Sequence, residues 1–149
     1  MDKNRKAFLD MIAKSEGTFG RGEDGYNVLV GGCLFSSYAD HPRKLIVLNK
    51  AGLGSTAAGR YQLLSRYFDA YKKQLKLDDF SPASQDAIAL QQIKECKALA
   101  DIDAGRINEA IKKCARIWAS LPGAGYGQHE HKIEYLLAAY IKSGGSLAG

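Results

Sequence analysis

KSEGT, residues 14–18, stands where an otherwise regular amphipathic pattern ends. Apolar residues before it recur at three- and four-residue spacing, which predicts a helix over about Asp2–Lys14. An acid, Glu16, then follows beside Gly17, where the helix gives way to a different kind of sequence. The role of this carboxyl group decides how the rest of the chain is interpreted.

Four further helices are predicted from the same periodicity. Ser81 followed by Pro82 is typical of a helix start, and Gly144-Gly145 of a helix end. The run Ala87–Leu90 leaves little polar face, so we expect the helix that contains it to be central and the most buried. The predicted ranges are about 58–75, 82–96, 107–117 and 133–141.

One small strand region is predicted at YNVLVGGCLF, residues 26–35, where alternating apolar residues flank a glycine pair. Two glycine-rich loops are expected at about 51–59 and 121–128. The fold class is therefore α+β and mostly helical, with a helical lobe and a small β-hairpin lobe. A cleft between two such lobes is a usual place for an extended ligand, and Glu16 would open onto it.

The composition is that of an ordinary globular protein, with 149 residues, 46% hydrophobic and 25% charged. This length favours a single domain over residues 1–149. The cysteines are odd in number and follow no motif spacing, so we expect free thiols in or near the core and synthesis in a reducing compartment. The N-terminus resembles neither a signal peptide nor a membrane span, and we expect no membrane insertion.

The net charge of +5 favours an anionic partner, and nucleic acid is the first class to consider. Acidic residues are interleaved with the basic ones along every predicted helix, and no nucleic-acid-binding motif is present. We therefore expect no nucleic acid. Mild positive charge is equally compatible with an extended anionic polymer such as those of bacterial walls.

Taken alone, Glu16 is better explained as a solvated carboxylate at a helix end. Six sequence blocks change this interpretation, because they occur in a fixed order over about residues 5–145. They are SEGT at 15–18, GGCLF at 31–35, DHPRKL at 40–45, GRYQLLSR at 59–66, SQDAIALQQIKE at 84–95 and IWASLPGAGYGQ at 117–128. In this order the blocks resemble the family of lambda-type phage endolysins, which are peptidoglycan lytic transglycosylases.

The resemblance implies a lysozyme-like fold and cleavage of the β-1,4 bond between N-acetylmuramic acid and N-acetylglucosamine without water, which leaves a 1,6-anhydromuramic end. Glu16 corresponds to the family's single catalytic glutamate. The partner is the peptidoglycan glycan strand, and no cofactor is needed. The resemblance also implies a monomer that accumulates in the host cytoplasm and acts on the wall from the periplasm after release by a holin.

One carboxyl group can suffice for this reaction. A neutral acid protonates the glycosidic oxygen, and its carboxylate then takes the proton of the sugar's own C6 hydroxyl as that oxygen attacks C1. Burial against apolar walls would keep the acid neutral. A hydrolase needs a second carboxylate instead, and the candidates here are Glu23, Asp24 and Asp40. Each is also explained as a turn or capping residue, and a two-carboxylate muramidase stays open as the alternative.

Five further residues are candidates for substrate binding: Gln62, Ser55, Thr56, Gly125 and Tyr126. The resemblance places a glutamine and a tyrosine of the family at the cleft, and the glycines around Tyr126 would let the backbone approach the glycan. The alternative for Gln62 is a surface residue of an amphipathic helix.

Two other classes of chemistry find little support. His129 and His131 lack a third ligand signature, so we expect no metal, and Cys33 lacks the surroundings of a nucleophile. A wall-binding protein without turnover is a further alternative. Relative to the family pattern, the stretch from Gly17 to Tyr26 is shorter and the loop at 51–54 is richer in glycine, which leaves fine substrate preference open.

Overall fold

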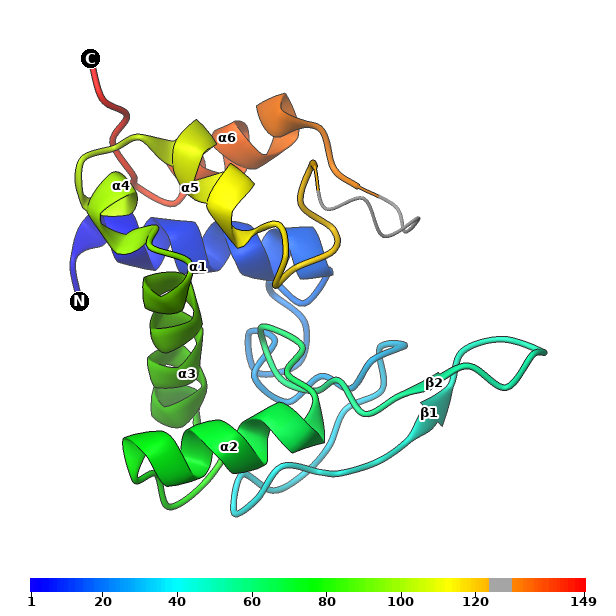
Figure 1. The fold of residues 1–149 in the computed structure, drawn as a ribbon. Helices are drawn as coiled ribbons and strands as arrows, with labels where there is room; N and C mark the ends of the chain where they lie inside the picture. The colour runs from blue at the N-terminus through cyan, green and yellow to red at the C-terminus, as the bar shows by residue number, and fades with distance from the viewer. Residues whose placement is uncertain (124–129) are drawn as a thin grey trace. The chain divides into compact units, whose positions relative to one another are not determined.

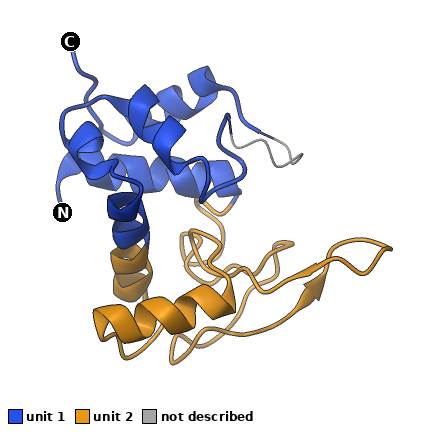
Figure 2. Cartoon of the chain, in the orientation of Figure 1, with its two compact units in different colours: residues 1–17, 89–149 blue, residues 18–88 orange. Residues whose placement is uncertain are grey.

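The computed structural model describes residues 1–123 and 130–149. The chain divides into two compact units, with residues 1–17 and 89–149 in unit 1 and residues 18–88 in unit 2 (Figure 2). The single domain expected from the chain length stays a prediction. In chain order the elements are α1 Lys3–Glu16, β1 Ile46–Val47, β2 Gly54–Ser55, α2 Ser65–Leu75, α3 Pro82–Glu95, α4 Leu99–Asp103, α5 Ile107–Cys114 and α6 Ile133–Lys142 (Figure 1).

Helix α1 forms the centre of unit 1. Its first turn is capped by Asp2, whose carboxylate accepts from the Asn4 N–H at 2.8 Å. Every residue from Ala7 to Ala13 is buried, because α1 packs against both α4 and α6. The helix continues to Glu16, slightly beyond the predicted end.

The prediction that α3 would be the most buried helix is wrong, since α1 has the longer buried stretch. Helix α3 places glutamines among its buried positions and ends in exposed Lys94 and Glu95. Its predicted start is confirmed, because the Ser84 N–H donates to Ser81 Oγ at 3.3 Å. The helix passes from unit 2 into unit 1 between Ile88 and Ala89.

The remaining helices of unit 1 differ from the prediction in two places. Helix α4 was not predicted, because five residues are too few to show a helical period. Helix α5 ends at Cys114 and not at residue 117. The predicted end of α6 is confirmed: Gly144 has a φ of 96°, and the Gly145 N–H donates to Tyr140 O at 3.1 Å.

Unit 2 contains the two-stranded antiparallel sheet, in which Ile46 pairs with Ser55 and Val47 with Gly54. The predicted hairpin at residues 26–35 is confirmed in part: both turn glycines have positive φ, and the Phe35 N–H donates to Asn27 O at 2.9 Å and the Leu29 N–H to Cys33 O at 2.6 Å. The pairing is too short to form a regular strand, with a single bridge from Val28 to Leu34, and Leu29 also bridges to Ala58. The sheet lies instead at residues 46–55, partly within a predicted loop.

Helix α2 begins at Ser65, and the prediction that it begins at Ala58 is wrong. Ala58 and Leu63 exchange backbone hydrogen bonds of 3.1 and 2.9 Å around a loop that contains Gly59 at a φ of 84°. A Cβ at residue 59 would approach Gln85 Oε1 to 2.4 Å, so this loop needs glycine. The core beneath it comprises Leu29, Ala58, Leu63, Phe68, Phe80 and Ile88.

The cysteines lie in two kinds of environment. Cys96 and Cys114 are buried, whereas Cys33 is exposed, so the prediction of three thiols in or near the core is wrong for Cys33. Its place beside the glycine turn explains the exposure. Within the described ranges, no helix carries an apolar stretch long enough to cross a bilayer.

Candidate active site

Glu16 is the last residue of α1, and the backbone turns away immediately after it. Gly17 has a φ of 78°, and its N–H donates to the Lys14 carbonyl at 3.2 Å, closing the helix. A residue with a Cβ is strained at this φ, so glycine here fixes the point at which α1 ends. The Glu16 side chain is therefore held at a helix terminus that is itself well defined.

The Glu16 carboxyl group is bound by a hydroxyl from a distant part of unit 1. Ser120 Oγ donates to Glu16 Oε2 at 2.5 Å, and Ser15 Oγ lies 2.6 Å from Ser120 Oγ. A serine hydroxyl carries one proton, so when Ser120 donates to the carboxylate, Ser15 must donate to Ser120. The three side chains form a short hydrogen-bonded chain that ends on Glu16.

His131 connects the same two serine residues through backbone groups. Its Nε2 lies 3.0 Å from Ser15 O, and its N–H donates to Ser120 O at 2.8 Å. Because a carbonyl oxygen can only accept, this contact requires the proton on Nε2. The His131 ring also stacks on Tyr135, with the ring centroids 4.8 Å apart.

Burial raises the pKa of Glu16 above the ordinary value of 4.5, and the hydrogen bond from Ser120 acts against this rise. Desolvation disfavours the charged carboxylate, whereas a donated hydrogen bond stabilises it. Within the described part of the chain, no lysine or arginine forms an ion pair with Glu16. This carboxyl group is therefore poised to exchange a proton closer to neutral pH than a solvated glutamate.

The three acids considered as a second carboxylate all belong to unit 2, and each has a local partner. Glu23 accepts from the Tyr38 hydroxyl at 2.6 Å, and Asp24 accepts from the Gly20 N–H at 2.9 Å. Hydrogen bonds from Arg43 hold the pKa of Asp40 below its ordinary value. These contacts agree with their interpretation as turn and capping residues.

The predicted substrate-binding residues of unit 2 also have local roles. Gln62 lies before α2, and its amide NH₂ donates to the Gly59 and Val28 carbonyls at 2.9 and 3.2 Å. Thr56 Oγ1 accepts from the Ser65 N–H at 3.0 Å and so caps α2. Substrate binding by these residues stays a prediction.

Ser55 is the remaining predicted substrate-binding residue of unit 2, and its Oγ accepts from the Ala57 N–H at 3.1 Å. Gly125, Tyr126 and His129 lie outside the described residues. Gly123 and Glu130 flank these residues in the sequence, and the Gly123 N–H donates to Glu130 Oε1 at 3.1 Å.

A buried arginine in unit 2 was not predicted from the sequence. Arg60 is 3% exposed, and its guanidinium lies over the rings of Phe19, Tyr26 and Tyr61, 5.3–5.7 Å from the centroids. Its carbonyl accepts from Thr18 Oγ1 at 2.6 Å. The arginine therefore anchors the segment that directly follows Glu16-Gly17.

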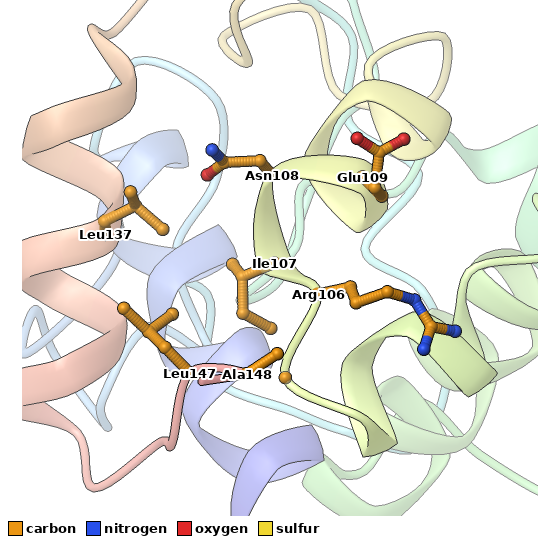
Figure 3. Close-up of a pocket in the computed structure, with 8 residues that line it drawn as sticks. Arg106, Ile107, Asn108, Glu109, Leu137, Leu147 and Ala148 are labelled. Carbon is orange, nitrogen blue, oxygen red and sulfur yellow. The ribbon is translucent and has the colours of Figure 1, made fainter.

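A separate pocket of about 240 Å³ in unit 1 contains none of the residues discussed above. It lies where the C-terminal segment passes α5 and α6, and its wall is mainly apolar (Figure 3). The Ala148 N–H donates to Gly105 O at 3.0 Å at its edge. The lining residues include Arg106, Ile107, Asn108, Glu109, Leu137 and Leu147.

The sequence pattern of the Endolysin family matches residues 6–147. The chain belongs to the endolysin family. The endolysin of Escherichia phage lambda is 62% identical, over 99% of this chain and 95% of that protein. The endolysin of Escherichia phage P2 is 50% identical, over 96% of this chain and 94% of that protein.

Solved structures give the fold of this endolysin. Bacteriophage lambda lysozyme complexed with a chitohexasaccharide matches with a TM-score of 0.96 at 60% identity, over 99% of this chain and 97% of that one. A second structure of lysozyme from bacteriophage lambda matches with a TM-score of 0.91 at 60% identity, with the same coverage of both chains. The predicted α+β, lysozyme-like fold is confirmed.

Proposed function

We propose that this endolysin is a lytic transglycosylase. It is a phage enzyme of cell-wall lysis that acts on peptidoglycan, and the proposal concerns how the bond breaks. It cleaves the β-1,4 bond between N-acetylmuramic acid and N-acetylglucosamine and leaves a 1,6-anhydromuramic end. The observation that carries the proposal is the contrast between Glu16, whose pKa is raised by burial, and the acids Glu23, Asp24 and Asp40, which each bind a local partner.

Glu16 acts first as an acid. Neutral Glu16 gives its proton to the glycosidic oxygen, which leaves with the N-acetylglucosamine residue, and positive charge develops at C1 of the muramic residue. The carboxyl group becomes a carboxylate at this moment. Ser120 then donates fully to Oε2, and Ser15 to Ser120, so the hydroxyl chain stabilises the charge as it forms.

Glu16 acts next as a base. Its carboxylate takes the proton of the C6 hydroxyl while the C6 oxygen bonds to C1 and closes the anhydro ring. Nucleophile and electrophile belong to the same sugar, so the step has a high effective molarity and needs no water. Glu16 ends the cycle neutral again.

A two-carboxylate muramidase remains the second candidate. It would require Glu23, Asp24 or Asp40 to hold water or attack C1. The bonds that these acids form with Tyr38, the Gly20 N–H and Arg43 favour structural roles for them. Mass spectrometry of the products from purified Gram-negative peptidoglycan separates the two reactions.

We expect muropeptides lighter by one water than hydrolysis products, without a muramic end that borohydride can reduce. Reducible muramic ends as the main product would establish the muramidase. If the parent and a Glu16→Gln variant both bind walls and neither clears permeabilised cells, the chain is a wall-binding protein.

The ligand of the proposed reaction is a glycan strand, and the lambda lysozyme structure solved with a chitohexasaccharide supports this class. We also propose that the enzyme is a monomer that accumulates in the host cytoplasm and reaches the periplasm through a holin. Fractionation of infected cells before and after holin triggering measures the change of compartment directly.

A further inference from the structure

The hairpin of unit 2 that contains β1 and β2, residues 44–55, carries exposed apolar side chains that the proposed reaction does not use. The exposed fractions are 64% for Leu45, 64% for Val47, 47% for Leu48 and 60% for Leu53. Single exposed apolar residues are normal on a protein surface, but these four gather on one hairpin and form a patch. The hairpin extends away from the rest of unit 2 (Figures 1 and 2).

The four side chains are divided between the two faces of the hairpin. In the register of the strands Val47 pairs with Gly54, and the Leu48 N–H donates to Leu53 O at 2.6 Å. Because directly opposite residues share a face and successive residues alternate, Leu48 and Leu53 lie on one face and Val47 on the other. Leu45 lies on the Val47 face, since a Cβ added at Gly54 would approach Leu45 Cδ1 to 2.8 Å. The hairpin is therefore apolar on both faces.

The charges that the hairpin presents to solvent are positive. Lys44 at its start and Lys50 in its turn are both exposed. No aspartate or glutamate lies between Asp40 and Asp69 in the sequence, and Arg43, just before the hairpin, forms ion pairs with these two acids. The hairpin thus combines apolar side chains with lysines and has no acidic residue of its own.

We propose that this hairpin docks on the surface of a bilayer that contains anionic phospholipid. Lysines fit the phosphate groups of such a surface, and exposed leucines can reach the boundary between head groups and acyl chains. A rigid partner would cover one face of a two-stranded ribbon and leave the leucines of the other face in water, whereas lipids surround both faces. A second copy paired along a strand edge would meet lysines of like charge.

The docking is peripheral and differs from a membrane span, for which no helix of the described chain is long and apolar enough. It does not depend on how the glycosidic bond is broken. The enzyme would be held at a membrane surface by unit 2, through side chains that are separate from the Glu16 carboxyl group and its serine partners.

The first experiment is sedimentation of the full chain with vesicles of phosphatidylglycerol and phosphatidylethanolamine, compared with vesicles of phosphatidylcholine alone. One lysine near an anionic surface contributes about 1 kcal/mol, or about fivefold in affinity. We therefore expect binding to the anionic vesicles to be at least about tenfold tighter than binding to the neutral ones. Equal binding to both kinds of vesicle, or binding to neither, would overturn the proposal.

Two double variants test whether the hairpin is the part that binds. We expect Leu48→Ser/Leu53→Ser and Lys44→Gln/Lys50→Gln each to lower the affinity for anionic vesicles by about tenfold or more. Both should unfold at the Tm of the parent, because the changed side chains are exposed. Leu147→Ser in unit 1 is the matched control, since Leu147 has the same exposed fraction as Leu48, 47%, and it should bind like the parent.

Parental binding by either double variant, or an equal loss in the control, would overturn the proposal. So would a Leu48→Ser/Leu53→Ser variant that binds vesicles normally but no longer sediments with purified peptidoglycan. That result would assign the patch to the glycan strand.

A tryptophan at the patch tests whether the hairpin reaches the acyl chains. The Leu53→Trp variant is mixed with anionic vesicles whose lipids carry bromine on the acyl chain, and the parent is the control because its Trp118 is 2% exposed. We expect bromine to quench the fluorescence of the variant and to leave that of the parent unchanged. Binding without quenching of the variant, or equal quenching of the parent, would overturn the proposal.

Discussion

Two carboxyl groups of unit 1, those of Asp101 and Glu16, have opposite properties. Asp101, whose side chain is 8% exposed, accepts from Lys113 Nζ at 2.6 Å and from Arg106 Nε at 2.8 Å. These hydrogen bonds hold the pKa of Asp101 below 3.8. Glu16 accepts from the Ser120 hydroxyl, and burial raises its pKa.

The difference shows that the type of partner, as well as burial, decides what a carboxyl group can do. A cation stabilises only the charged form, and so it keeps the carboxylate ionised at neutral pH. A hydroxyl is both donor and acceptor, and so it can partner either form of the acid. Asp101 is thereby a structural anion that links α4 to α5, whereas Glu16 can give a proton and take one back.

The largest expected effect is that of Glu16→Gln, which keeps the size of the side chain but removes its proton chemistry. We expect clearance of permeabilised cells to fall by at least about a hundredfold, the lower range for loss of a general acid. Exposed Glu109→Gln is the matched control and should clear cells like the parent. Normal clearance by Glu16→Gln would contradict the proposed role.

Asp101→Asn should affect stability and leave the activity of folded protein unchanged. We expect the free energy of unfolding at pH 7 to fall by about 1–2 kcal/mol, because two charged hydrogen bonds are weakened. The pKa of Asp101 is lower in the folded chain than in the unfolded chain. The extra stability of the parent is therefore present above pH 3.8 and is lost as the pH falls through the folded-state pKa. Urea unfolding of parent and variant across this pH range measures the difference in free energy of unfolding, and a difference that persists in strong acid would contradict this explanation.

Ser120→Ala should alter how activity depends on pH. Without the donated hydrogen bond, the pKa of Glu16 rises further, so the acid stays protonated to higher pH. The alkaline limb of the plot of kcat against pH therefore moves to higher pH. We expect kcat itself to fall by about tenfold or less, the effect of one lost hydrogen bond.

Ser15→Ala should move the same limb in the same direction by a smaller amount, because Ser15 acts through Ser120. Ser84→Ala, in α3, is the control and should leave the limb unchanged. A limb that moves to lower pH in Ser120→Ala would rule out this role for the hydroxyl.

The smallest effect is expected for Arg106→Gln. The Arg106 side chain is half exposed, and such ion pairs contribute only about 0.5 kcal/mol to the free energy of unfolding. Lys113 still partners Asp101 in this variant, so the carboxylate stays ionised. A loss as large as that of Asp101→Asn would mean that Arg106, and not Lys113, is the main partner.

The sequence predicted most helices well because their apolar faces repeat over several turns. The start marked by Ser81 and the end marked by Gly144 are local signals, and the structure has them where expected. The strands β1 and β2 have two residues each, which is too short for alternation to show. Helix α4 was missed for the same reason.

The candidate site was predicted less completely. Glu16 could be singled out only because the ordered sequence blocks resemble a family, since its local pattern alone favours a solvated helix end. Ser120 was missed although it lies within one of those blocks, because no local pattern reveals that its hydroxyl reaches a residue 104 positions earlier. His131 was considered only as a metal ligand, and its contacts with Ser15 and Ser120 depend on the tertiary fold.

The discontinuity of unit 1 affects the order of events during translation. Residues 18–88 leave the ribosome as one uninterrupted stretch, whereas α1 emerges first and its partner α6 among the last residues. Ser120, too, is made late, so a nascent chain carries Glu16 without its hydroxyl partner for most of synthesis. A prematurely terminated polypeptide that stops before Ser120 would hold the acid but not its proton-handling surroundings, and the ability to attack a wall would arise only near the completion of the chain.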